Sequence, residues 1–168
     1  MPQADEERTR KILRALEADA RRTPAELAAL VGIGEGEAAA IVSGLERRGV
    51  IRAYRTVVDW DKVTPDRVLA FIDVSVTPQR DVGFDQVAAR IYRHPEVRSV
   101  HLVSGGHDLR VVVEGPTIRE ISAFVGEKLA PIDHVTATNT HFLLKAYKEE
   151  HSILVEEPAD DDRLAVTP

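Results

Sequence analysis

The residues Ser104–Leu109, SGGHDL, combine side-chain types that suit a small zwitterionic ligand. The adjacent glycines Gly105 and Gly106 permit a backbone with positive φ and leave N–H groups free to bind a carboxylate. Asp108 can bind an ammonium group, so the segment offers partners for both ends of an amino acid. The same residues also suit an ordinary turn, in which the glycines supply the bend and Asp108 bonds its own loop.

Three threonines alternate further along the chain, and alternation on a strand places side chains on one face. Their hydroxyls would add hydrogen bonds to the same ligand, but threonine is also common in strands for its shape alone. The candidate effector-binding residues are Ser104, Gly105, Gly106, His107, Asp108, Thr136, Thr138 and Thr140.

The six histidines are spread singly over the chain, and no two have metal-ligand spacing on one helix. His101 and His141 fall on expected strands, where alternation places them at a solvent or subunit face. Cysteine is absent, which excludes disulfides and thiolate ligands. The sequence has no nucleophile elbow, phosphate-binding loop or dinucleotide fingerprint. We therefore predict no catalytic residue, no cofactor and no metal site.

Residues 32–51, GIGEGEAAAIVSGLERRGVI, have the outline of a helix that reads DNA. Its first turns carry Glu35 and Glu37, which suit the helix dipole but repel phosphates. Long donors that read base edges are absent from these turns, so we expect weak direct base reading. The candidate DNA-binding residues are Ser43, Arg47, Arg48, Arg52 and Arg55, and a further basic group consists of Arg10, Lys11, Arg14, Arg21 and Arg22.

Each of these arginines can hold a phosphate without reading sequence. The alternative is that Arg47 and Arg48 only complement the negative C-terminal end of their helix. Our hypothesis is a DNA binder of modest intrinsic affinity that relies on several linked modules. Linking modules raises avidity by ~10²-fold or more when the geometry fits.

The arginines belong to a half of the chain that has helical periodicity over residues 6–49. The segment Thr23–Glu26 is a capping box with a proline at the first helical position, and the helix it starts ends at Gly32. A further helix is expected at about Glu35–Arg48, closed by Gly49. Two short helices joined by a tight turn are typical of a helix-turn-helix. The alternation in residues 50–60 predicts a β-wing.

The effector-site residues belong to a half in which the period changes to two, from about Val68. Residues 97–115 predict two strands around the glycine pair, and a last strand begins near Val135. Helices are expected at about 84–91 and after the capping box Thr117–Glu120. The order β-α-β-β-α-β predicts a ferredoxin-like fold.

The net charge of −6 is not evenly distributed over the 168 residues. Residues 1–65 carry 11 basic and 11 acidic side chains, residues 66–148 carry 10 of each, and residues 149–168 carry one arginine and seven acids. The folded part is therefore neutral and lacks the basic footprint of a strong DNA binder. No apolar run approaches the ~20 residues that span a bilayer, and the N-terminus lacks a signal-peptide core. We expect a cytoplasmic protein without a membrane partner.

These patterns together predict an α+β protein of two domains. The expected parts are a winged helix-turn-helix at residues 1–58, a linker at 59–67, a ferredoxin-like oligomerisation and effector-binding domain at 68–148, and an acidic, mobile tail at 149–168.

This order of domains, with GVIRAYRTVVD at the joint and VSGGHDLRVVVEG in the hairpin, resembles the Lrp/AsnC family of feast/famine transcription regulators over about residues 6–148. The motif LERRGVI at 45–51 and the spacing of Gly105 and Asp108 are the most specific shared features. The resemblance implies a regulator whose first half binds double-stranded DNA. It also implies that a second, RAM-type half forms homodimers, often octamers, with a small effector, usually an amino acid, bound between subunits near the hairpin.

The chain departs from this family in two places. Family members usually carry Arg or Lys before the Leu-Glu pair, where this chain has Ala40, Ile41, Ser43 and Gly44, and an aromatic residue often stands at the position of His107. Two alternatives on the same architecture stay open. One is a sirohaem decarboxylase-like enzyme, although its basic, His-containing motif is not matched in this chain. The other is an effector sensor or partner subunit that does not bind DNA.

Overall fold

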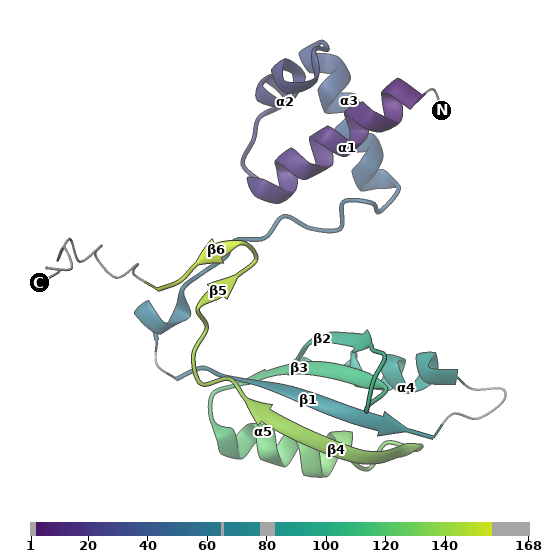
Figure 1. The fold of residues 1–168 in the computed structure, drawn as a ribbon, viewed down its shortest axis with the longest axis vertical. Coiled ribbons are helices and arrows are strands. Elements are labelled where there is room, and N and C mark those ends of the chain that lie inside the picture. The colour runs from purple at the N-terminus through teal and green to yellow at the C-terminus, as the bar shows by residue number, and fades with distance from the viewer. Residues whose placement is uncertain (1–2, 65, 78–82, 156–168) are drawn as a thin grey trace, which may run out of the picture. The chain divides into compact units, whose positions relative to one another are not determined.

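The computed structural model describes residues 3–64, 66–77 and 83–155. The chain divides into two compact units, Met1–Val58 and Asp59–Pro168. Each unit has its own cluster of buried apolar side chains, so each is described by itself (Figure 1).

The first unit consists of three helices, α1 at Gln3–Ala18, α2 at Pro24–Val31 and α3 at Glu35–Arg47. Their apolar stripes meet in a core that contains Ile12, Leu16, Leu27, Ala28 and Ala38. The axes of α2 and α3 differ by 105°, which is the angle expected of a helix-turn-helix. In the described residues, no single helix is both long and apolar enough to cross a membrane; α2 and α3 reach that length only as this bent pair.

The sequence signals at the ends of α2 are confirmed. The Thr23 hydroxyl accepts from the Glu26 N–H at 3.3 Å, and the Glu26 carboxylate accepts from the Thr23 N–H at 2.7 Å. Gly32 has φ 70° and its N–H donates to the Ala28 carbonyl at 2.9 Å, so glycine is favoured there because other residues rarely adopt a positive φ.

The expected β-wing is not formed within the described chain. The extended segment at residues 52–58 pairs with no other strand, and the next element is the short 3₁₀ turn η1 at Trp60–Lys62. Strand pairing needs a neighbour for its N–H and C=O groups, and no backbone hydrogen bond joins this segment to another described part of the chain. The alternation was therefore insufficient to predict a strand.

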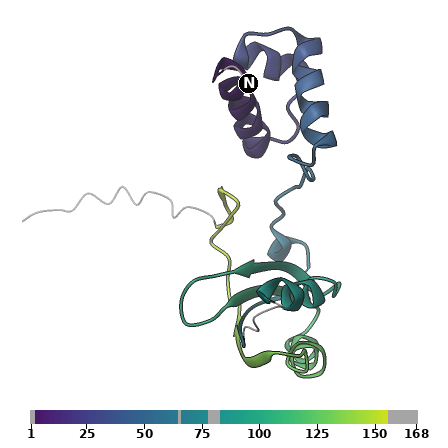
Figure 2. The ribbon, with the colours of Figure 1, turned by 90° about the vertical axis from the view of Figure 1, so that its right-hand side faces the viewer.

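The second unit is built on a four-stranded antiparallel sheet with the order β2-β3-β1-β4. The strands are β1 at Val68–Val76, β2 at Val97–Leu102, β3 at Leu109–Gly115 and β4 at Val135–Phe142. The helices are α4 at Gly83–Ile91 and α5 at Ile118–Phe124 (Figure 2). The chain order β-α-β-β-α-β confirms the predicted ferredoxin-like arrangement.

Both helices pack on one face of this sheet. The alternate β1 residues Ala70, Ile72 and Val74 are fully buried in one cluster with apolar residues of α4 and α5. The helix α5 continues into a wider π turn, η2 at Val125–Leu129, in which the Ala130 N–H donates to the Val125 carbonyl at 2.8 Å. The intervening β1 residues point to the opposite side, which we call the open face because no described helix packs on it.

A small hairpin follows the sheet, formed by β5 at Lys148–Glu149 and β6 at Ser152–Ile153. It occupies the beginning of the segment for which the sequence predicts a mobile tail. Residues 156–168 lie outside the described residues, so the rest of that prediction falls on them.

Candidate DNA and effector sites

The side of α3 that points away from the core carries small side chains except at its C-terminal end. Gly36, Ala40, Ser43 and Arg47 follow one another at helical spacing, and we call them the outward stripe. Ser43 is half-buried, whereas the other three are exposed. Small side chains let a helix approach another molecule closely, and Arg47 is the one long donor of this stripe.

Two of the three glutamates of α3 have partners inside the first unit. The Glu37 carboxylate lies 4.0 Å from the Arg8 guanidinium of α1. The Glu46 carboxylate accepts a 2.8 Å hydrogen bond from the Tyr54 hydroxyl, and this bond raises the pKa of Tyr54. The charge of Arg8 therefore partly compensates the acidity of α3. The sequence did not predict either contact because Arg8 and Tyr54 lie outside α3.

The predicted DNA-binding arginines differ in how free their side chains are. The Arg48 Nε donates to the Gly44 carbonyl at 3.3 Å, so this side chain caps its own helix, as the alternative for Arg48 supposed. The Arg52 guanidinium packs over Gly49, with its carbon 3.3 Å from the place where a Cβ would stand. Arg47 and Arg55 are exposed, the former at the end of α3 and the latter on the extended segment.

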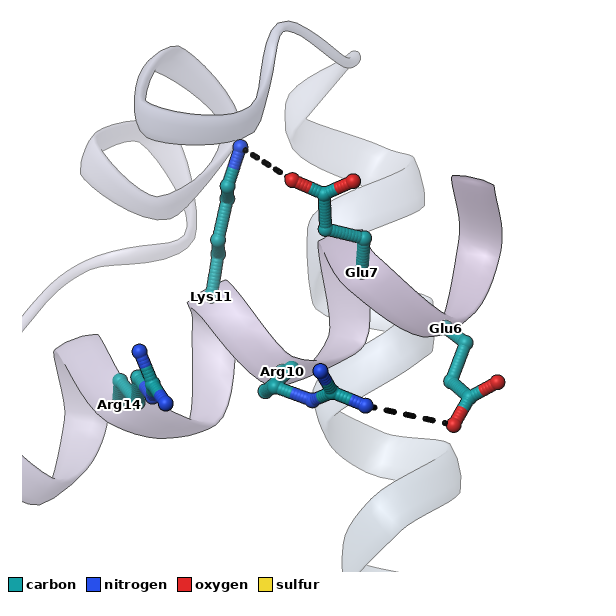
Figure 3. A pocket seen from close by; sticks show the side chains of 5 residues that line it. All are labelled: Glu6, Glu7, Arg10, Lys11 and Arg14. Carbon is teal, nitrogen blue, oxygen red and sulfur yellow. Dashed lines mark hydrogen bonds and ion pairs between the residues drawn. The ribbon is translucent and has the colours of Figure 1, made fainter. Parts of the chain in front are cut away.

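The basic residues of α1 lie along a hollow with acids interspersed (Figure 3). Arg10 pairs with Glu6 at 3.5 Å, and Lys11 pairs with Glu7 at 3.1 Å. Such i,i+4 pairs are typical of a solvated helix face. The pairing reduces the net charge that this group offers to phosphates.

The loop between β2 and β3 holds the predicted glycine pair and Asp108. Gly105 has φ 139°, and a Cβ at Gly105 or Gly106 would meet no atom within 4 Å. The Asp108 carboxylate accepts from the Val76 N–H at 2.8 Å, and the Asp108 N–H donates to the Val74 carbonyl at 3.1 Å. Asp108 thus joins the loop to the end of β1 and leaves open space beside the glycines.

The three threonines do not share one environment. Thr138 and Thr140 stand opposite Val74 and Ile72 in the ladder, which puts them on the helix-covered face. Thr136 lies at a register shift, and its hydroxyl donates to the Ser75 carbonyl at 3.1 Å. The shift interrupts the alternation at Thr136, so strand spacing alone does not put all three side chains on one face. Thr136 shares the end of β1 with Asp108.

The open face holds a charged cluster that the sequence did not reveal. Asp73 is only 5% exposed, and both Nε and Nη2 of Arg110 lie 2.9 Å from its Oδ1. The Nε2 atoms of His107 and His141 lie 3.8 and 3.5 Å from the other oxygen, Oδ2. We call these four residues the Asp73 cluster. Its members come from β1, β3, β4 and the loop, so only the strand register brings them together.

The Asp73 cluster keeps its carboxylate ionised. The hydrogen bond from Arg110 holds the pKa of Asp73 below its usual value, against the effect of burial, and the charges of Arg110, His107 and His141 act in the same direction. His107 is the one predicted effector-site residue in this cluster, and its Nδ1 lies 3.4 Å from the Ser75 hydroxyl.

Comparisons with known families divide the chain at the same place as the geometry. A model described as winged helix-turn-helix DNA-binding matches residues 5–52. A model described as the Lrp/AsnC ligand binding domain matches residues 69–153.

Several curated proteins are similar over nearly the whole chain. The uncharacterized HTH-type transcriptional regulator YugG of Bacillus subtilis is 43% identical over 96% of this chain and 98% of its own. The proline dehydrogenase transcriptional activator of Rhodobacter capsulatus is 31% identical over 85% of this chain and 92% of its own. Among solved structures, a transcriptional regulator of Neisseria meningitidis in complex with L-Met is 27% identical, with a TM-score of 0.67 over 84% of this chain and 91% of its own.

Proposed function

The chain belongs to the Lrp/AsnC family of transcriptional regulators, and from this premise we propose the residues through which it binds DNA and a small effector. Its function is that of a DNA-binding transcriptional regulator of the Lrp/AsnC type. The match of residues 5–52 to a winged helix-turn-helix is the observation that carries this conclusion.

For DNA, we propose that the outward stripe of α3 enters the major groove, as the second helix of such motifs does. Arg47 is the side chain of this stripe with the reach and donors to bind a guanine edge. Ser43 contributes a hydroxyl, and Arg52 and Arg55 bind backbone phosphates, which adds affinity without adding sequence preference. Arg48 contributes less to DNA binding, because its side chain caps its own helix.

A gel-shift series over salt with random-sequence duplexes tests this proposal. We expect binding near 50 mM salt that weakens steeply by 200 mM, because bound arginines release counterions from the phosphates. A folded preparation that binds no duplex at low salt would contradict the DNA-binding function and favour a free-standing sensor.

For the effector, we propose an amino acid bound beside the loop of Ser104, Gly105, Gly106 and His107, where the backbone leaves open space. The free oxygen of Asp108 would bind the ammonium group, and exposed N–H groups of the loop would bind the carboxylate. The similar regulator from Neisseria meningitidis was solved with L-Met, which supports this ligand class.

Calorimetry with a panel of amino acids, L-methionine included, tests the effector site. We expect heat from at least one member, and a loss of that heat in Asp108→Asn with Thr138→Val as a control on the covered face. No heat from any member would contradict the site.

We further propose that two copies associate through the open face, with the extended segment at residues 52–58 adding strand pairing. Half-buried Leu69, Phe71 and Val112 give the face an apolar centre, and the paired charges of Asp73 and Arg110 leave it neutral. Two such faces can meet without net repulsion. Sedimentation velocity tests this, and a monomer at micromolar concentration would contradict it.

We propose no catalytic step for this chain and place its action in the cytoplasm, where a regulator meets the chromosome. The relatives are named as regulators, which favours this function over the sirohaem decarboxylase-like alternative. Adding the protein to sirohaem should leave the absorption spectrum of sirohaem unchanged.

A further inference from the structure

The Asp73 cluster has a property that neither DNA binding nor effector binding uses. One buried carboxylate oxygen lies between two imidazoles, while the other is fully engaged by Arg110. The two distances, 3.8 and 3.5 Å, are longer than hydrogen bonds. Among the described residues, no three His, Asp or Glu side chains could hold a metal. Each imidazole forms an ion pair with this oxygen only when it carries a second proton.

The charge of the cluster changes with pH in one direction. With neutral imidazoles, Asp73 and Arg110 cancel and the cluster carries no net charge. Imidazole is the side chain that ordinarily gains its proton between about pH 8 and 5. Once His107 and His141 are both protonated, the cluster carries two positive charges, because Asp73 keeps its negative charge.

The neighbouring groups compensate these charges only in part. From β2, His101 stands opposite Arg110 on the same face and adds a further positive charge when protonated. From β4, Asn139 contacts the His141 Nε2 at 3.1 Å and is neutral. Asp108, next to His107 in the loop, accepts from the neutral Val76 N–H and keeps its own negative charge, which offsets part of the charge gained at His107. Glu114 is paired with Arg67 and Arg98.

We propose that the Asp73 cluster is a proton-responsive element that weakens self-association through the open face as the pH falls. This inference rests on the proposed association of two copies. Covering the open face removes water from His107 and His141, which are 37% and 54% exposed in one chain. Removing water disfavours the charged form, and two facing clusters of like charge repel each other. Association therefore expels protons, and acid opposes it.

The number of protons released on association determines how strongly the dissociation constant depends on pH. The dissociation constant of the pair rises by up to about tenfold per pH unit for each proton expelled. We expect at least a tenfold rise for the full-length protein between pH 7.5 and 5.5.

The experiment compares dissociation constants from sedimentation equilibrium at pH 7.5, 6.5 and 5.5, for the native protein and for the double variant His107→Gln with His141→Gln. Circular dichroism reports whether each sample is folded. The matched control is His151→Asn, since His151 lies in the β5–β6 turn with φ 70° and asparagine tolerates that conformation.

A steep pH dependence in the native protein and the control, reduced in the double variant, would support the proposal. An equal slope in all three, or association that does not vary with pH, would overturn it while leaving the proposed pairing intact. A protein that stays monomeric at every pH would overturn both. Imidazole NMR gives a second readout: the His107 and His141 signals must titrate at lower pH in concentrated samples than in dilute ones, and equal midpoints would overturn the proposal.

Discussion

In the first unit, charged groups lie at the surface of helices, where Glu37 faces Arg8 and Glu46 accepts from Tyr54. In the second unit, Asp73 lies buried in the middle of a sheet face, where it depends on Arg110. Surface pairs in water contribute little to stability, so the first unit is free to use its surface for DNA. A buried carboxylate that loses its partner is costly, so in the second unit the proposed association face and the folding energy depend on the same residues.

The largest effect should come from breaking the second core alone. Ile72→Ala removes a side chain with no exposure, and we expect a loss of about 2–5 kcal/mol in the free energy of unfolding of that unit. Trp60, the single tryptophan, stacks under Arg67 in the second unit, so its fluorescence reports this transition in urea. The far-UV signal of the first unit should keep its midpoint, and an equal shift of both signals would contradict two separate units.

The next effect concerns the surface of the first unit. Arg47→Ala should cost about 1–3 kcal/mol in DNA binding free energy and relax the sequence preference at the guanine it contacts, because an exposed donor of the outward stripe is lost. Arg48→Ala should cost clearly less, because its Nε is already occupied by the Gly44 carbonyl. Gel shifts over salt measure the DNA affinity of both variants. Equal losses would show that the contacts each arginine makes within the free protein do not determine which one binds DNA.

The stability that the Asp73 carboxylate gains from Arg110 should depend on pH. Asp73→Asn should lower the free energy of unfolding at pH 7 by about 1.5–3 kcal/mol, the range for hydrogen bonds to charged groups. The lowered pKa of Asp73 means that this stabilisation is full above the unfolded value of about 4 and is lost as the pH falls through the folded value. Urea unfolding at pH 7 and 3 should therefore show the native protein and the variant converging in acid. Parallel curves would contradict the linkage.

The smallest effect compares the helix caps of the two units. Thr23→Ala should cost about 1 kcal/mol, because a reciprocal capping box is lost. Thr117 accepts from the Glu120 N–H at 3.1 Å, but its own N–H donates no hydrogen bond to the Glu120 carboxylate, so Thr117→Ala should cost less. Thermal unfolding of both variants measures this order, and a reversed order would mean that the reciprocal bond adds nothing.

The sequence was sufficient for features that depend on near neighbours along the chain. The Thr23 box, the turn at Gly32 and the change of period near Val68 follow from spacing, and they predicted both folds. Features that depend on strand register were not predictable in this way. Asp73 meets Arg110 and His141 through ladders that join residues far apart in sequence, and a register shift interrupts the alternation at Thr136.

The residues of the proposed effector site were predictable only in part for the same reason. The loop glycines and Asp108 are local signals, but the bond from the Val76 N–H to Asp108 is a long-range contact. The prediction of a β-wing was wrong for a different reason, because alternation in the sequence carries no information about whether a pairing strand exists within the chain.

The π turn at Val125–Leu129 has an evolutionary consequence. A π turn holds one residue more than an α turn, and such turns occur as single wide turns within ordinary helices. Removing one residue there would let the helix close to regular geometry without moving Ile118 or the start of β4. A sequence shorter by one residue in this interval should therefore still keep the strand pairing of β4.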